Sequence, residues 1–318
     1  MIHCALCFHD SGTMHKTVYC AVRSILENSS EKVHIHLLID DTVIPNKHWF
    51  EELCAEFDSP LSFYDNVTVP DDVVGLYPNG RVGNYTQASL FRMCLHEQLP
   101  EEVEKVIYLD CDIIVERDIA DFWNLELSDA WAVATHDSER RWSSRKKEYY
   151  LKALNIPEER YFNSGVLLMN LKALREASKD ENIFWKAYKE LSAQFSSLKF
   201  QVYDQDLLNY MLCNDHDKLK LVDADFNYEL CLWDRRFMRL EEMKGKILHY
   251  AALKPWEKFF PATLAYWKYY AKSPWRDEVL PMLDERMFDP KDRIWPILLW
   301  IMRRHTSLRW ISRLYGAR

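Results

Sequence analysis

The stretch Val-Ile-Tyr-Leu-Asp-Cys-Asp-Ile-Ile-Val at residues 106–115 decides how the fold is interpreted. Its apolar, largely β-branched residues predict a buried parallel strand. The two acids, Asp110 and Asp112, would project to the same side of an extended chain, and the stretch contains no Lys or Arg to offset them. Two carboxylates this close should either retain a proton or bind a divalent cation, and oxygen ligands suit magnesium and manganese. The Asp-x-Asp (DXD) motif therefore favours a phosphate-holding metal site at a strand end, whereas an Asp that simply ends a strand is the plainer alternative.

The rest of the chain alternates between strand-like and helix-like segments. We expect strands at residues 2–8, 33–39, 61–64, 106–115, 131–135 and 166–169, and helical segments at 18–27, 49–57, 89–98, 183–195 and 205–212. This alternation predicts an α/β fold with a mainly parallel sheet, in which ligands bind beyond the carboxyl ends of the strands. Asp10, Asp110, Asp112 and Asp137 each lie at or just after the end of an apolar run, so we expect them to line one edge of the sheet.

Composition limits how a phosphate group could be bound. The chain has 318 residues, 48% of them hydrophobic, which is enough for one enzyme-sized core. Only 7 residues are Gly, and neither a G-x-G-x-x-G sequence nor a P-loop is present. Phosphate charge must then be met by a cation and by side chains rather than by a Gly-rich loop.

The eight cysteines do not form the pattern of a disulfide framework. Several lie inside apolar runs, and Cys4-x-x-Cys7 falls in an expected strand with no later partner pair for zinc. The amino-terminal residues resemble a first strand and not a signal peptide, and no stretch is apolar for the length of a membrane span. These features predict a reducing, cytoplasmic location.

The last part of the chain has a different charge from the rest. Residues 293–318 contain six Arg, three Trp and no acid, so this tail carries a net charge of +6. Residues 1–292 carry −14, which together with the tail gives the total net charge of −8. Basic and aromatic residues together at a terminus suit an anionic membrane surface, although a helix docked on the acidic body is an alternative. The acidic body argues against nucleic acid as a partner.

Five motifs occur in one order along the chain. They are YLDCDIIV at 108–115, YFNSGVLLMNL at 161–171, DQDLLN at 204–209, HY at 249–250 and KPW at 254–256. Over about residues 1–260 this ordered set resembles glycosyltransferase family 8, whose retaining enzymes use UDP-sugars, and most of all its bacterial lipopolysaccharide galactosyl- and glucosyltransferase branch. The resemblance implies a Rossmann-like nucleotide-sugar fold of the GT-A type and a requirement for Mn²⁺ or Mg²⁺.

The resemblance also assigns roles to individual positions. Asp110, Asp112 and His249 match the family's metal ligands, and Lys254 matches the lysine that meets the diphosphate. Donor-contacting residues would be Asp10, Arg92, Asp110, Cys111, Asp137, Asn163, Asp204, Gln205 and Lys254. As catalytic residues it implies Gln205, near the reacting anomeric carbon, and Asp206, near the sugar or the acceptor.

The residue types fit the implied chemistry. A cation, an imidazole and an ammonium would offset charge that develops on a UDP leaving group. Carboxylates and amide oxygens would stabilise an oxocarbenium-like sugar. Taken alone, Asp204, Asp206 and Asn209 could instead be the first turn of a helix, the Asn163-Ser164-Gly165 sequence an ordinary turn, and His249 a structural histidine.

These expectations define a retaining α-glycosyltransferase. It would have a catalytic domain at 1–270 and a membrane-associating helical segment at 271–318. It would transfer glucose or galactose from UDP-glucose or UDP-galactose to a lipid-linked or protein-linked glycan such as lipopolysaccharide, at the inner face of the plasma membrane. Two other classes of protein are alternatives: a non-catalytic nucleotide-sugar or glycan-binding protein, and a haloacid-dehalogenase phosphatase. The phosphatases normally carry Asp-x-Asp on the first strand and a later Gly-Asp sequence. This chain lacks any Gly-Asp sequence.

Overall fold

The computed structural model describes most of the chain before residue 279. The described residues are 1–10, 12–39, 47–65, 67–74, 87–137, 151–195, 204–213, 215, 217–230, 234, 238–251, 254–257 and 261–278. The basic tail at 293–318, and all of the expected segment 271–318 after residue 278, lie outside the described residues. Within the described residues, no helix combines the length and the apolar character needed to cross a membrane.

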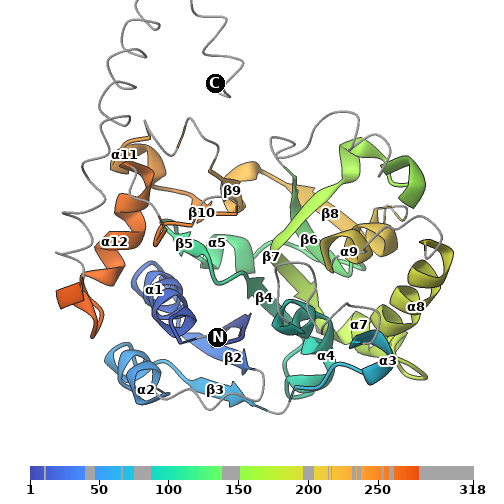
Figure 1. The fold of residues 1–318 in the computed structure, drawn as a ribbon, viewed down its shortest axis with the longest axis horizontal. Coiled ribbons are helices and arrows are strands. Elements are labelled where there is room, and N and C mark those ends of the chain that lie inside the picture. The colour runs from blue at the N-terminus through green and yellow to red at the C-terminus, as the bar shows by residue number, and fades with distance from the viewer. Residues whose placement is uncertain are drawn as a thin grey trace, which may run out of the picture.

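A seven-stranded sheet, in the order β3-β2-β1-β4-β7-β6-β8, forms the centre of the molecule (Figure 1). Its strands are β1 Ile2–Phe8, β2 Val33–Ile39, β3 Leu61–Tyr64, β4 Lys105–Leu109, β6 Ala132–His136, β7 Phe162–Asn170 and β8 Leu219–Val222. All neighbouring pairs are parallel except those of β7, which runs antiparallel to both β4 and β6. The reversed β7 therefore brings its first residues to the edge where β1, β4 and β6 end.

Helices cover both faces of this sheet. They are α1 Met14–Glu27, α2 Lys47–Glu56, α3 Asp71–Val74, α4 Leu95–Gln98, α5 Ala120–Trp123, α7 Leu171–Ala177, α8 Ile183–Phe195, α9 Asp204–Leu212, α11 Leu240–Met243 and α12 Leu264–Tyr270, with 3-10 helices η2 Gln87–Cys94, η3 Glu158–Arg160, η5 Ala224–Phe226, η6 Pro261–Thr263 and η7 Arg276–Glu278. Alternate residues of β1 enter different cores: Cys4 and Leu6 pack with α1 and α2, while Ala5 and Cys7 pack with η2 and α4. The α/β architecture with a mainly parallel sheet, expected from the sequence, is confirmed.

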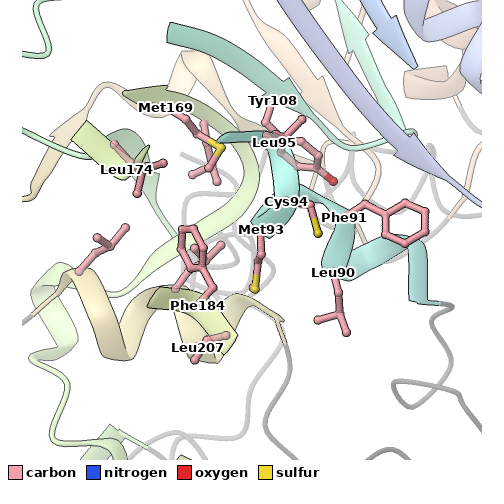
Figure 2. Packing of buried hydrophobic residues seen from close by; sticks show 14 of the residues in the cluster. Leu90, Phe91, Met93, Cys94, Leu95, Tyr108, Met169, Leu174, Phe184 and Leu207 are labelled. Atoms are coloured by element: carbon pink, nitrogen blue, oxygen red, sulfur yellow. The ribbon is translucent and has the colours of Figure 1, made fainter. Parts of the chain in front are cut away.

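The core that contains Ala5 and Cys7 fixes the position of η2 next to the sheet. Figure 2 shows Met93 and Leu95 packed among Tyr108, Phe184 and Leu207, which come from β4, α8 and α9. Leu90 and Phe91 are also buried. Because its neighbours are anchored in this way, η2 holds Arg92 against the end of β4.

The expectation that residues 106–115 form one strand is wrong. Strand β4 ends at Leu109, and a new strand, β5 Ile113–Val115, joins a separate three-stranded sheet with β10 Ile247–His249 and β9 Tyr228–Glu229. The Asp-x-Asp motif is thus the turn between two sheets, not a pair of positions in an extended strand. Other boundaries shift less: residues 87–94 form a 3-10 helix before α4, and β7 begins at Phe162 rather than at residue 166.

Candidate active site

The carboxyl edge of the large sheet brings together residues from distant parts of the chain. Asp10 follows β1, Asp110 follows β4 and Asp137 follows β6, as the sequence predicted. The first residues of β7 and of α9 reach the same region. Asn163 contacts Asn227, which in turn contacts His249. Asp204 forms an ion pair with Arg92, which also pairs with Asp110. Residues spaced over more than half of the chain therefore share one site.

Asp110, Asp112 and His249 form a group that can hold a metal ion. Each offers one ligand atom, and these atoms lie within 4.8 Å of one another. His249 Nε2 lies 3.4 Å from Asp112 Oδ1 and 3.8 Å from Asp110 Oδ2. Two carboxylates with one imidazole suit Mn²⁺ well, and Mg²⁺ less well.

The backbone beside this group has no room for a side chain. A Cβ added to Gly165 would lie 2.4 Å from His249 Cε1 and 2.8 Å from Asp110 Oδ2. Contacts this short do not occur in real structures, so the His249 and Asp110 side chains can approach this backbone only because residue 165 is Gly. The strand beginning at Phe162 thus forms one wall of the site.

Two positive charges, the buried Arg92 and the partly exposed Lys254, compensate the two carboxylates. Burial alone would raise the pKa of Asp112, but Lys254, which forms an ion pair with it, and His249 hold that pKa well below its ordinary value. Arg92 Nη2 lies 2.9 Å from Asp110 Oδ1 and 3.2 Å from Asp204 Oδ2. Each acid of the motif therefore has its own cation.

Arg92 is held rigidly from several sides. It donates to the Ser89 and Ser164 carbonyl oxygens at 2.9 and 2.8 Å, and it stacks 4.3 Å from the centre of the Tyr108 ring. Burial would lower its pKa, but Asp110 and the other nearby anionic groups raise it above its ordinary value. The guanidinium is therefore a fixed positive charge at the base of the site.

An amide chain orients His249. The ring donates from Nδ1 to Asn227 Oδ1 at 2.9 Å, so Nε2 presents its lone pair toward the two acids. Asn227 donates to Asn163 Oδ1 at 2.8 Å, and Asn163 donates to Glu229 at 2.9 Å. Asn227 and Glu229 are not predicted from the sequence, because each looks like an ordinary polar residue near a short strand. Only the pairing of β9 with β10 reveals their role.

Gln205 occupies a similarly fixed position. Its Oε1 accepts from the Ser164 backbone N–H at 3.1 Å, and its Nε2 donates to Asp137 at 2.9 Å and lies 3.2 Å from the Tyr161 hydroxyl. These contacts bring together the predicted residues Asp137 and Gln205. They fix which end of the amide is oxygen and which is nitrogen.

Asp206 faces a different direction from its neighbour Gln205. It is only 2% exposed, and its Oδ1 accepts from the Tyr161 hydroxyl at 3.0 Å. Tyr161 in turn contacts Gln205, so in this structure Asp206 reaches the Gln205 amide through Tyr161. The predicted role of Asp206 at the sugar or acceptor stays a prediction.

Asp10 and Cys111 lie at the margin of the group. The Asp10 carboxylate contacts His15 Nδ1 at 2.9 Å and accepts from the Gly12 N–H at 3.1 Å, which organises the turn after β1. Cys111 donates to the Cys7 carbonyl at 3.3 Å, and burial raises the pKa of its thiol well above the ordinary value. The Cys111 side chain therefore ties the Asp-x-Asp turn to β1 as a neutral thiol.

The sequence of the chain is similar to those of known glycosyltransferases. The profile of a family described as "Glycosyl transferase family 8" matches residues 10–259. A "Putative glycosyltransferase" of Haemophilus influenzae is 26% identical over 208 residues, covering 65% of this chain and 58% of its own length. Lipopolysaccharide glucosyltransferase WaaO of Escherichia coli is 25% identical over 269 residues, covering 82% of this chain and 75% of its own.

The fold has a solved counterpart as well. The galactosyltransferase LgtC, determined with donor and acceptor sugar analogues, superposes with a TM-score of 0.67 at 20% identity, over 87% of this chain and 99% of that one. The likeness shows that the fold is of the GT-A type, as the sequence predicted.

Proposed function

Because the chain belongs to glycosyl transferase family 8, we propose that it is a retaining glycosyltransferase. In this proposal it moves a hexose from a UDP-hexose to a sugar hydroxyl of a cell-surface glycan or glycolipid, and the product is an α-glycoside. The observation that carries the proposal is the convergence of Asp110, Asp112 and His249 at the carboxyl edge of the sheet, with Lys254 on Asp112. Open α/β sheets bind their ligands at that edge.

The leaving group determines what the charged residues do. A bound Mn²⁺ or Mg²⁺ would offset negative charge on the diphosphate. Asp110, Asp112 and His249 are the residues that would hold it, and Asn227 keeps the His249 ring in the orientation that this requires. Lys254 forms an ion pair with Asp112 and would meet the diphosphate, which would stabilise the departing UDP.

The fixed amide of Gln205 would face the donor sugar. An amide oxygen is a weak nucleophile, so it is suited to stabilising positive charge on the anomeric carbon rather than to forming a lasting bond. The acceptor hydroxyl would then attack from the face that UDP leaves, and a diphosphate oxygen would take its proton. Asp137 and Ser164 hold Gln205 in place for this role.

Arg92 and Asp204 would lie beside the donor hexose. Their ion pair joins η2 to the first turn of α9, 3.2 Å apart. Burial and the nearby Asp110 raise the pKa of Asp204, although Arg92 opposes this. The pair gives the sugar pocket both donors and acceptors for hydroxyl groups.

The sugar and the acceptor are proposed at the level of class. WaaO is named a lipopolysaccharide glucosyltransferase, and a Salmonella typhimurium relative, 24% identical over 260 residues, is named a lipopolysaccharide 1,3-galactosyltransferase. The match spans 58% of the Haemophilus influenzae relative and 62% of General stress protein A of Bacillus subtilis, so both proteins contain more than this chain aligns with. UDP-glucose and UDP-galactose are therefore both candidate donors, with a lipid-linked or protein-linked saccharide as acceptor.

The basic tail supports a location on the membrane. Six Arg and three Trp with no acid in residues 293–318 would bind anionic lipid at the inner face of the plasma membrane, with the enzyme on the cytoplasmic side. Vesicle sedimentation at about 0.1 and 1 M salt tests this, because the Debye length falls from about 10 Å to about 3 Å. Equal binding by a chain that ends near residue 292 would contradict the tail's role.

A turnover assay separates an enzyme from a binding protein. The full chain is incubated with each UDP-sugar, Mn²⁺ and a saccharide acceptor, and UDP release and product formation are measured with and without EDTA. We expect metal-dependent product whose proton NMR spectrum has an α-anomeric signal. Donor binding in a thermal-shift assay without any turnover would favour the binding-protein alternative, and a β-linked product would contradict the retaining mechanism.

A further inference from the structure

Three histidines gather in the amino-terminal half of β1 and β2, away from the edge that carries the acids. His3 lies on β1, and His34 and His36 lie on β2. His3 is directly opposite His34 in the parallel register, and His34 and His36 are two residues apart. Because alternate residues of a strand share a face, all three rings project from the same side of the sheet.

The nitrogen atoms of the three rings converge. One nitrogen from each ring lies within 4.8 Å of the other two. His3 Nδ1 is 2.9 Å from His36 Nε2, and the ring of His34 stacks on that of His36 with centres 4.0 Å apart. His36 is completely buried, while His3 and His34 are half-buried, so the group is open on one side.

Neighbours on β3 hold the outer nitrogens. His36 Nδ1 is 3.0 Å from the Tyr64 hydroxyl, and His34 Nε2 is 2.9 Å from the Ser62 hydroxyl. Partners of this kind fix the tautomer of a metal-binding imidazole and turn its lone pair inward. Here they leave His36 Nε2, which lies beside His3 Nδ1, and the second nitrogen of His34 as the atoms that would bind an ion.

We infer that His3, His34 and His36 form a second divalent-metal site, of the class that takes Zn²⁺. Three imidazoles are borderline-soft ligands that suit zinc, cobalt, nickel or copper, whereas Mn²⁺ and Mg²⁺ prefer oxygen. A three-histidine site leaves one coordination position for water or a carboxylate. The charge of Glu102 acts on His3, so Glu102 is a candidate for that carboxylate.

His3 and His36 need only small movements to bind the ion, whereas the His34 ring must rotate out of its stack on His36. Two zinc–nitrogen bonds of about 2.0–2.1 Å at a tetrahedral angle place the nitrogens about 3.3 Å apart. The present separation between His3 Nδ1 and His36 Nε2 is 2.9 Å, so the pair must open by a few tenths of an ångström. The hydrogen that they share would move to the other nitrogen of its ring, and the half-exposed His34 would turn off its stack.

The imidazoles are also in the right charge state. Burial first, and then the neighbouring His34, lower the pKa of His36 to about 3 and of His3 to about 4. Burial lowers the pKa of His34 too. Near neutral pH the rings therefore keep their lone pairs, and no proton must leave the protein before a metal binds.

Metal uptake at this group can be measured on the full chain. The site at Asp110 and Asp112 is first saturated with Mn²⁺ and UDP, and Zn²⁺ or Co²⁺ is then titrated in. We expect one tightly bound Zn²⁺ per chain and a rise in melting temperature of at least about 3 °C. Bound Co²⁺ should give the intense visible absorption of a four-coordinate ion, which six-coordinate Co²⁺ does not give.

Matched variants decide whether the histidines are the ligands. His34→Gln and His3→Gln should each weaken Zn²⁺ binding by more than about tenfold, while His48→Gln, on the exposed side of α2, should leave it unchanged. None of the three should alter glycosyl transfer. The inference is overturned if the wild-type chain binds no Zn²⁺ in the presence of Mn²⁺ and UDP, or if both His34→Gln and His3→Gln retain its stoichiometry and cobalt spectrum.

Discussion

The two ends of the central sheet each carry three side chains that can bind a metal, yet they are built differently. At the carboxyl edge, Asp110 and Asp112 bring negative charge that Arg92 and Lys254 must offset. In the amino-terminal half, the three imidazoles are neutral, and the hydroxyls of β3 are enough to hold them. The first site needs cations from distant elements, whereas the second is complete within three adjacent strands.

This difference indicates which site is suited to chemistry. A charged group assembled from several loops and strand ends can respond when a charged substrate arrives. A neutral group on neighbouring strands of one sheet mainly holds those strands together. Changes at the carboxyl edge should therefore affect activity first, and changes at the histidines should affect stability first.

The largest effect should come from Asp112→Asn. The substitution removes a proposed metal ligand and the partner of Lys254, so we expect kcat/KM to fall by at least about 10³-fold. Circular dichroism should show a folded protein, since Asn has the same shape. His34→Gln is the matched control, and near wild-type activity of Asp112→Asn in the presence of EDTA would sink the assignment of the metal site.

Gly165→Ala should come next. The added methyl would lie 2.4 Å from His249, so we expect a loss of activity of roughly 10²-fold and a loss of about 1–3 kcal/mol of stability. Gly245→Ala is the control, because no heavy atom lies within 4 Å of its Cβ although its φ of +78° makes Ala unfavourable there. Gly245→Ala should lose stability only. Equal activity of the two variants would show that crowding at Gly165 does not matter.

Asn227→Ala should have a smaller effect that extra metal can reverse. Without its Asn227 partner, His249 loses the hydrogen bond that fixes its ring, which should raise the Mn²⁺ concentration for half-maximal rate by about 10–100-fold. The maximal rate at saturating Mn²⁺ should change little. A lower rate that saturating Mn²⁺ does not restore would instead indicate a role in the chemical step.

The smallest effect should be on the pH dependence of unfolding in EDTA. His3 and His36 have folded-state pKa values of about 4 and about 3, below the ordinary 6.5, so the unfolded chain binds more protons between these limits. Stability should therefore fall as pH drops below 6.5, and the buried His36 should contribute more to this fall than the half-buried His3. His3→Gln should reduce the slope above pH 4.

The carboxyl edge should respond at lower pH. Because the pKa of Asp112 is held well below 3.8, its contribution to stability is present above that value and is lost only as pH falls further. Denaturant melts from pH 7 to pH 3 separate the two windows. A slope between pH 6.5 and pH 4 that His3→Gln leaves unchanged would show that the histidines are not the groups that titrate.

The strands of the sheet and the acids at its edge could be predicted from the sequence, because apolar runs and the acids that follow them are local features of the chain. Apolar runs ending in Asp10, Asp110 and Asp137 show strand ends directly. The split of residues 106–115 between two sheets was not predictable, since the residues on both sides of the motif are equally apolar. Which sheet Ile113 joins depends on its pairing with His249, far along the chain.

Interactions between distant strands were missed for the same reason. The His34-Ile35-His36 sequence looks like any half-exposed strand, and only the pairing of β1 with β2 adds His3. The role of Asn227 likewise depends on β9 lying beside β10. Positions that follow from strand ends can be found in a sequence, whereas positions that follow from strand neighbours need the structure.

The ion pair between Lys254 and Asp112 also has a consequence for synthesis of the chain. Arg92 is made 18 residues before Asp110, so that acid has its cation from the start. Lys254 is made 142 residues after Asp112, a delay of roughly 7–30 s at about 5–20 residues per second. Until then Asp112 has neither Lys254 nor His249 to favour its burial, so the nascent chain cannot close this site before Lys254 has left the ribosome.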